Sequence, residues 1–371
     1  MTSIAQFFAS RLGIVVVGVI IGILAPVLQK LGNPGNMGIC VACFERDIAG
    51  ALGLHRAAVV QYLRPEIIGF VLGATLAALA FREFKARTGS APIARFILGI
   101  FAMVGALVFL GCPWRALFRL AGGDLNAILG LAGLIAGVSI GVWFLRNGYN
   151  LGRAHPARAA VGWIMPAIMI FFLLLAIFTP TFFDGGPIFS SETGPGSQHA
   201  ALIISLIAGL LIGVLAQRTR FCTMGSFRDV ILMGDTHLLS GLGGLLVAAF
   251  VTNLLLGQFN LGFTGQPVAH SNHLWNFLGM VLAGLAFALA GGCPGRQLFM
   301  SGEGDGDAAV FVTGMIVGAA FAHNFNLAGR PDAVVEGVVT VGGPSPWGMA
   351  AVVAGLLVCV ALGFAMREKY E

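Results

Sequence analysis

Charged residues are scarce in this chain of 371 residues. They make up 10% of it, against 57% hydrophobic residues, whereas a soluble domain carries roughly 25% charged residues. Apolar runs of about 18 residues recur along the whole length, which is long enough for a helix to span a bilayer. The runs are continuous rather than alternating, which argues against a membrane β-barrel. The composition therefore predicts an all-α integral membrane protein.

Several motifs of other protein classes are missing. No block of basic residues indicates nucleic-acid binding, and no Walker motif indicates ATP binding. The six cysteines are spread over the whole chain at expected helix ends, which is not the pattern of a disulfide framework. We expect His270 and His273 in a solvated loop, and His323 is a candidate for lining a pore. Since the histidines show no metal-ligand spacing, we expect no metal, no cofactor and no nucleic-acid partner.

One motif occurs twice. The windows 111–124 and 292–305 share eight of fourteen residues without a gap, where chance would give about one. Both begin with Gly-Cys-Pro-x-Arg, at Cys112 and at Cys293, so the offset is 293 − 112 = 181. This repeat indicates that the chain contains a duplicated unit.

A second pair of cysteines repeats at nearly the same offset. Cys40 and Cys222 are each followed at six and seven residues by Arg-Asp, and their offset is 222 − 40 = 182. Each half therefore carries two cysteine motifs. We divide the chain into a first half-repeat (1–178), an external linker rich in Pro, Gly and Ser (179–198) and a second half-repeat (199–371).

The apolar runs predict ten membrane crossings, five in each half. They lie near 12–28, 65–81, 93–111, 125–146, 161–178, 199–216, 238–256, 274–292, 307–325 and 346–366. A short helix is expected after each repeated cysteine, at 41–53, 113–120, 223–234 and 294–301. These four are too short to span and would be re-entrant helices buried in the protein. Because each half has an odd number of crossings, we expect the second half to be inverted relative to the first.

Basic residues favour one side of this arrangement. That side carries Arg11, Arg82, Lys85, Arg87, Arg95, Arg146, Arg153, Arg158, Arg218, Arg220, Arg367 and Lys369. The positive-inside rule makes it cytoplasmic, with both termini inside and the protein in the plasma (inner) membrane. Cys40 and Cys112 would then approach from outside, and Cys222 and Cys293 from inside.

Proline directly after a cysteine gives the thiol a defined place. Pro suits the first position of a helix, so the Cys before it is expected to be the N-cap. There the thiol lies among free backbone N–H groups and at the positive end of the helix dipole, an arrangement that attracts anions. Half-helices meeting from opposite sides would form an anion site near the midplane, as in broken-helix transporters. The alternative is that the cysteines are small packing residues.

Arg and Asp recur together beside these cysteines. The four sets are Arg46 with Asp47, Arg115 with Asp124, Arg228 with Asp229, and Arg296 with Asp305. Charges inside a membrane are functional candidates by default. The alternative is that each set is a local ion pair that holds a half-helix in place, and the Arg side chains could also orient an oxyanion.

Two further cysteines lie outside the repeat. Cys40 and Cys43 form a C-x-x-C motif, which is typical of redox or metal sites, but no second such motif or nearby His supports zinc. Cys43 aligns with Gly225 and has no repeat counterpart. Cys359 lies within the last predicted crossing and is expected to be a core residue.

The motifs resemble a known family. The two Gly-Cys-Pro-x-Arg motifs, the 222–229 segment and its counterpart at Cys40 are similar to the YeeE/YedE family of sulfur-compound transporters, over essentially the whole chain. Stretches such as 35–38, 46–50 and 322–325 look most like the YedE branch, which is associated with selenium transport. The resemblance implies an hourglass-shaped bundle of inverted repeats. It also implies a central path on which Cys112, Cys222 and Cys293 pass the substrate on through S–H hydrogen bonds, with Cys40 as the symmetry mate.

This reasoning predicts a transporter, not an enzyme, for a small sulfur- or selenium-containing solute such as thiosulfate. Cys43 departs from the family pattern and leaves room for a selenium species. A divalent anion entering against about 100 mV faces roughly 2 × 2.3 kcal/mol, so uptake would need ion coupling or consumption by an intracellular sulfur or selenium carrier protein. The alternatives are a membrane thiol oxidoreductase that uses Cys40 and Cys43, and a structural or partner-binding membrane protein.

Overall fold

The computed structural model describes residues 3–179, 181–183, 186–335 and 338–368. Within these ranges, ten long helices lie within three residues of the predicted crossings. They are α2 (Arg11–Lys30), α4 (Pro65–Ala80), α5 (Pro92–Phe109), α7 (Asn126–Arg146), α8 (Ala159–Phe178), α9 (Leu202–Thr219), α11 (His237–Leu255), α12 (His273–Ala290), α14 (Gly306–Asn324) and α15 (Pro346–Ala365). Nine of them are apolar and long enough to cross a membrane, and α4 is an apolar helix of 16 residues. The all-α membrane fold predicted from composition is confirmed.

The four short helices are also present. They are α3 (Val41–Ala51), α6 (Pro113–Ala121), α10 (Thr223–Met233) and α13 (Pro294–Gly302). The sequence did not predict helix α1 (Ser3–Ala9) or three short antiparallel strand pairs. These pair β1 (Arg87–Thr88) with β2 (His155–Pro156), β3 (Thr181–Phe183) with β4 (Gly186–Pro187), and β5 (Ala333–Val335) with β6 (Val338–Thr340). Strands of two or three residues are too short to show the alternation that identifies a strand.

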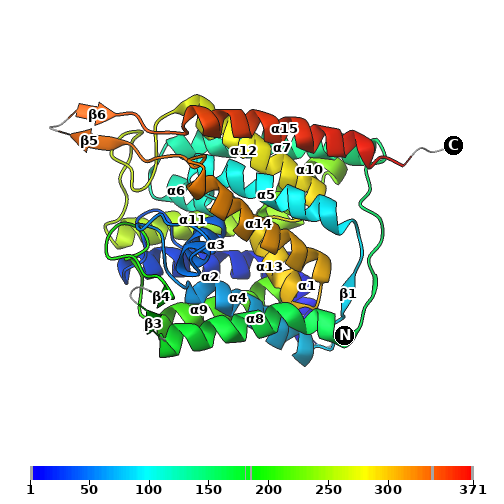
Figure 1. Ribbon diagram of the computed structural model, residues 1–371. Coiled ribbons are helices and arrows are strands. Elements are labelled where there is room, and N and C mark those ends of the chain that lie inside the picture. The colour runs from blue at the N-terminus through cyan, green and yellow to red at the C-terminus, as the bar shows by residue number, and fades with distance from the viewer. Residues whose placement is uncertain (1–2, 180, 184–185, 336–337, 369–371) are drawn as a thin grey trace.

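The bundle has two distinct ends (Figure 1). One end carries α1, β1 and the carboxyl end of α15, and we call it the arginine-rich end because Arg87, Arg146, Arg218 and Arg367 lie there. The other end carries the β3–β4 and β5–β6 hairpins, and we call it the hairpin end. Residues on the predicted basic side of the membrane therefore gather at one end of the molecule.

The closest helix packing joins the two halves. Helix α2 packs against α11 and α4 against α9, while α5 packs against α14 and α7 against α12. By their order in each half, α2 corresponds to α9, α4 to α11, α5 to α12 and α7 to α14. The repeat therefore converts the contact of α2 with α11 into that of α9 with α4, and the contact of α5 with α14 into that of α12 with α7. Helices α8, α11 and α15 are the least buried and present large apolar side chains outward, as lipid-facing helices do.

Glycine permits the tightest of these contacts. A Cβ atom added to Gly73 of α4 would lie 2.2 Å from the carbonyl oxygen of Leu210 in α9. A Cβ on Gly213 of α9 would in turn lie 2.4 Å from the carbonyl oxygen of Phe70 in α4. Because real Cβ atoms do not approach backbone oxygens this closely, only glycine allows α4 and α9 to pack at this distance.

We therefore expect Gly73→Ala to lower the free energy of unfolding by about 1–3 kcal/mol, the usual effect of overpacking. Thermal unfolding of the purified protein in detergent would measure it. Gly243→Ala is the matched control, because Gly243 lies on an exposed face of α11 with no atom within 4 Å of the added Cβ. If both variants unfold at the wild-type temperature, the result would contradict the close packing of α4 against α9.

Candidate functional site

The four repeated cysteines occupy equivalent positions. Cys40, Cys112, Cys222 and Cys293 are the N-caps of α3, α6, α10 and α13. Proline follows at the first helical position in α6 and α13, as predicted. In the other two helices the thiol itself is the cap: Cys40 Sγ accepts from the backbone N–H of Cys43 at 3.3 Å, and Cys222 Sγ accepts from that of Gly225 at 3.2 Å.

All four short helices begin inside the bundle, and their carboxyl ends are directed toward one of its two ends. At the carboxyl end of α3, the carbonyl of Ala51 accepts a hydrogen bond from the backbone N–H of Phe189. Shortly after α6, the backbone N–H of Leu125 donates to the carbonyl of Gly262. Both contacts lie toward the hairpin end. In α10 the carbonyl of Ile231 accepts a hydrogen bond from the side chain of Arg146. Directly after α13, the carbonyl of Glu303 accepts from the backbone N–H of Lys85. Both contacts lie at the arginine-rich end. The positive ends of the four helix dipoles are therefore directed into the protein.

The cysteines associate within each half of the chain. Cys40 Sγ and Cys112 Sγ lie 3.7 Å apart. Cys222 and Cys293 likewise lie beside each other. All six cysteines are free and buried. The fold thus brings the four cysteines together as two pairs of thiols.

A polar cavity of about 520 Å³, which we call the larger cavity, opens at the arginine-rich end. Its wall includes Cys222, Arg220, Arg228, Asp229 and Arg296. Arg228 donates to the carboxylate of Asp229 at 2.8 Å, so these two form the predicted local pair. The excess of arginines gives this cavity a charge that favours anions.

The smaller cavity lies toward the hairpin end and has a volume of about 230 Å³. Arg46, Leu110, His323 and Arg330 contribute to its wall. His323 therefore faces a cavity, as the sequence suggested, and its ring lies 4.6 Å from that of His55. The two cavities share no lining residue, and within the described chain Cys222 is the one repeated cysteine that reaches either of them.

Asp47 joins two arginines inside the protein. Arg46 and Arg64 each lie 2.7 Å from the Asp47 carboxylate, and all three side chains are almost completely buried. Arg64 also donates to the carbonyls of Pro195 and Gln198, which fixes the linker to α3. The predicted pairing of Arg46 with Asp47 is correct, but sequence reasoning missed Arg64, which has no counterpart in a repeated motif.

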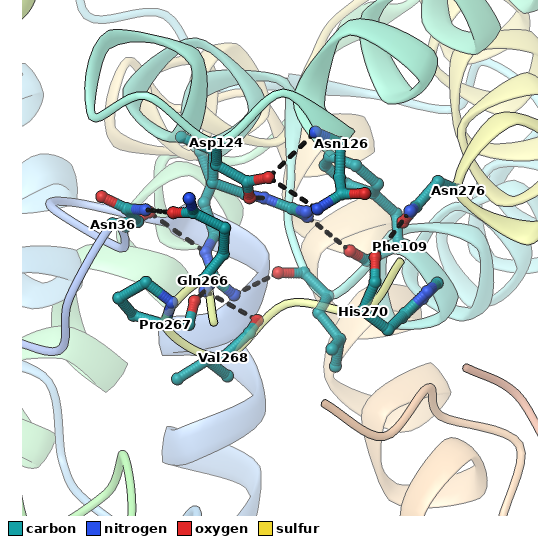
Figure 2. A network of polar contacts seen from close by, with 12 residues as sticks. Asn36, Phe109, Asp124, Asn126, Gln266, Pro267, Val268, His270 and Asn276 are labelled. Atoms are coloured by element: carbon teal, nitrogen blue, oxygen red, sulfur yellow. Dashed lines mark hydrogen bonds and ion pairs between the residues drawn. The ribbon is translucent and has the colours of Figure 1, made fainter. Parts of the chain in front are cut away.

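The predicted pairing of Arg115 with Asp124 is wrong. Asp124 accepts instead from Arg119 at 2.5 Å and from the backbone and side chain of Asn126 at 2.9 Å (Figure 2). The repeat pointed to Arg115 because it aligns with Arg296, whereas Arg119 aligns with Met300 and carried no such signal.

Arg115 instead holds backbone carbonyls. It donates to Leu110 before α6 and to Pro267 and Val268 in the loop between α11 and α12. Its Nη1 also lies 3.6 Å from the thiol of Cys43. Figure 2 shows this loop gathered against α6, with Gln266 bonded to Asn36. Arg115 thus stabilises the re-entrant segment beside the thiols rather than pairing with a carboxylate.

The predicted pairing of Arg296 with Asp305 is also wrong. Arg296 lies 3.1 Å from Glu303. Asp305 pairs with Arg87 of β1 at 2.7 Å and caps α14 through the backbone N–H of Ala308. The turn after α13 separates the two residues, so each finds its own partner at the arginine-rich end.

Two predictions about single residues have opposite outcomes. His270 is not in a solvated loop: it is buried, and its Nε2 lies 2.8 Å from the carbonyl oxygen of Val108 (Figure 2). The loop folds inward against α5, which local sequence does not reveal. Cys359 is a fully buried core residue of α15, as predicted.

Comparison with known proteins supports a transport family in the second half of the chain. The family described as "Sulphur transport" matches residues 218–371. The "Thiosulfate transporter TsuA" of Spirochaeta thermophila is 34% identical over 100 residues, which cover 27% of this chain and 29% of that protein. The "Thiosulfate transporter TsuA" of Escherichia coli is 29% identical over 108 residues, which cover 29% of this chain and 30% of that protein. Each match therefore spans less than a third of the relative's length.

The two Arg–Asp sets predict different effects of charge removal. Asp47→Asn leaves Arg46 and Arg64 buried without a counter-charge, so we expect a loss of about 3–5 kcal/mol in unfolding free energy. Asp229→Asn affects a pair at a cavity wall, and we expect about 1 kcal/mol or less. Thermal unfolding and the yield of folded protein would compare them. Equal loss in both variants would contradict the difference in burial.

Proposed function

We propose that this protein transports a small sulfur oxyanion, with thiosulfate as the first candidate, across the plasma membrane. The observation that carries the proposal is the placement of four cysteine-capped helix N-termini inside the bundle, between two arginine-lined cavities. The match of residues 218–371 to a sulphur-transport family and the two relatives named as thiosulfate transporters support it.

The chemistry of the site suits such a substrate. Helix N-termini offer free backbone N–H groups and positive potential to an anion. A thiol is a weak hydrogen-bond donor and a polarisable contact for a sulfur atom. In this proposal the substrate moves from the smaller cavity past Cys40 and Cys112 to Cys293 and Cys222, and leaves through the larger cavity.

The same proposal includes an inverted repeat. Residues 1–178 and 199–371 would be the two half-repeats, joined by the linker 179–198, with both termini cytoplasmic at the arginine-rich end. Two features support this: the exchange of helix contacts between the halves, and short helices whose carboxyl ends are directed toward opposite ends of the bundle. The positive-inside rule gives the orientation.

Net uptake of an anion against the membrane potential needs an energy source. A divalent anion entering a cell at about 100 mV faces roughly 2 × 2.3 kcal/mol. Ion coupling or consumption by an intracellular sulfur or selenium carrier protein would offset it. A selenium oxyanion such as selenite is the second candidate substrate, because it presents the same acceptor oxygens.

A thiol oxidoreductase is the weaker alternative. Cys40 and Cys43 have no exposed surface and line neither polar cavity. A disulfide exchange partner has to reach the attacking sulfur. Burial of both thiols, together with relatives named as transporters, supports transport rather than redox catalysis.

Serine substitution tests the role of the thiols. Cys112→Ser, Cys222→Ser and Cys293→Ser keep the size and a donor but lose the sulfur, so we expect folded protein with uptake reduced at least about tenfold, corresponding to one interaction of about 1.4 kcal/mol. The assay is uptake of radiolabelled thiosulfate, and separately of selenite, by proteoliposomes. Cys359→Ser is the control and should transport normally. Wild-type uptake by Cys112→Ser and Cys293→Ser together would exclude a thiol path.

Labelling of Cys222 tests the orientation. This cysteine lines the larger cavity at the arginine-rich end. We expect a membrane-impermeant maleimide to label a variant that retains Cys222 alone in inside-out vesicles, and much more slowly in intact cells. Labelled protein would be quantified by mass shift on a gel. Faster labelling from the outside would reverse the proposed topology.

A further inference from the structure

The two Gly-Cys-Pro-x-Arg motifs differ at their central position, which is Trp114 in the first and Gly295 in the second. These equivalent residues face each other. A Cβ atom added to Gly295 would lie 3.5 Å from Cζ2 and 3.6 Å from Cε2 of the Trp114 indole. The side chain of Trp114 therefore reaches the N-terminus of α13, at the position where the second motif has no side chain.

The indole is packed among aromatic rings beside the larger cavity. Trp114 is 1% exposed, and its ring centroid lies 5.8 Å from those of Phe70 and Phe221 and 6.3 Å from that of Phe299. Phe221 directly precedes Cys222, which lines the larger cavity. Trp114 thus contacts Phe221, the residue next to one that lines the cavity.

The polar edge of the indole has no partner. Trp114 Nε1 is buried and makes no hydrogen bond in the described chain. Nε1 is covalently bonded to Cε2, one of the two indole atoms closest to Gly295. The N–H edge of the indole therefore lies at the N-terminus of α13. Buried donors are normally satisfied, and an exception at a helix N-terminus indicates a site for an acceptor that is not part of the chain.

A second unpartnered donor flanks the same thiols. The hydroxyl of Thr223 is buried without a hydrogen-bond partner. Thr223 follows Cys222, and its backbone N–H lies near the thiol of Cys293. Its counterpart in the first half is Val41, just as the counterpart of Trp114 is Gly295. Both extra donors thus lie near the Cys222–Cys293 pair and neither is duplicated at Cys40–Cys112.

We propose that Trp114 Nε1, Thr223 Oγ1 and the thiols of Cys222 and Cys293 form the selective oxyanion site of the transport path, with Gly295 leaving room for the bound anion. The proposal rests on the transport function above and assigns its specificity to one half of the repeat. Several neutral donors around one space favour an anion with several acceptor oxygens.

Gly295→Ala is the sharpest test. The added methyl group makes only ordinary contacts, at 3.5 to 3.7 Å, and the backbone of Gly295 is not left-handed. The variant should therefore fold as well as the wild type, while the methyl group occupies the space for the anion. We expect the KM for thiosulfate uptake to rise at least about tenfold, with Gly243→Ala unchanged as the matched control.

Two substitutions separate hydrogen bonding from packing. Trp114→Phe keeps an aromatic ring but removes the N–H, and Thr223→Val keeps the shape but removes the hydroxyl. Each should raise the KM about tenfold or more at normal expression and unfolding temperature, and weaken equilibrium binding of radiolabelled thiosulfate to the purified protein by a similar factor. If the role of Trp114 were purely structural, Trp114→Phe would change the unfolding temperature, while the KM and the affinity for thiosulfate would stay unchanged.

The outcomes distinguish the two proposals. If the wild type transports thiosulfate or selenite and all three variants keep its KM and affinity, the oxyanion site is wrong and the transport function stands. If the wild type transports and binds neither anion, the transport function itself is wrong.

Discussion

The structure depends on how a bilayer treats helix ends. The first N–H groups of a helix have no intrahelical partner, and in a membrane they cannot bond to water. This protein places four such ends inside the bundle and caps each with a cysteine. A thiol is a weaker acceptor than a hydroxyl or a carboxylate. Under the proposed function, the caps would leave the N-termini available to a passing anion, whereas a stronger cap such as Asp would occupy them permanently.

The charged residues have a different task from the cysteines. Asp47, Asp124 and Asp305 are each bound to an arginine, and two of them also fix a neighbouring segment. Arg115 is held by backbone carbonyls. These buried contacts keep the short helices in position. The interior between their N-termini is left to thiols, aromatic rings and glycine.

Sequence reasoning succeeded where local rules decide the outcome. Apolar runs gave the long helices, and proline after Cys112 and Cys293 gave the caps. It failed for the partners of Arg115, Arg296 and Asp305, because alignment of the repeats shows which residues are equivalent and not which residues touch. Equivalent residues face different surroundings: Arg119 pairs with Asp124, while its counterpart Met300 cannot. The burial of His270 and the contact of Trp114 with Gly295 likewise depend on tertiary packing that no single motif contains.

The interleaved packing of the two halves has a consequence for biosynthesis. Helix α4 packs against α9 and α2 against α11, so the earliest helices to leave the ribosome contact partners made more than a hundred residues later. Contacts so distant in sequence form late and slowly. The glycine-rich faces of α2 and α4 must therefore wait in the membrane, covered by lipid or by the insertion machinery, until the second half has been synthesised. A chain interrupted between the halves would leave these faces open to neighbouring helices.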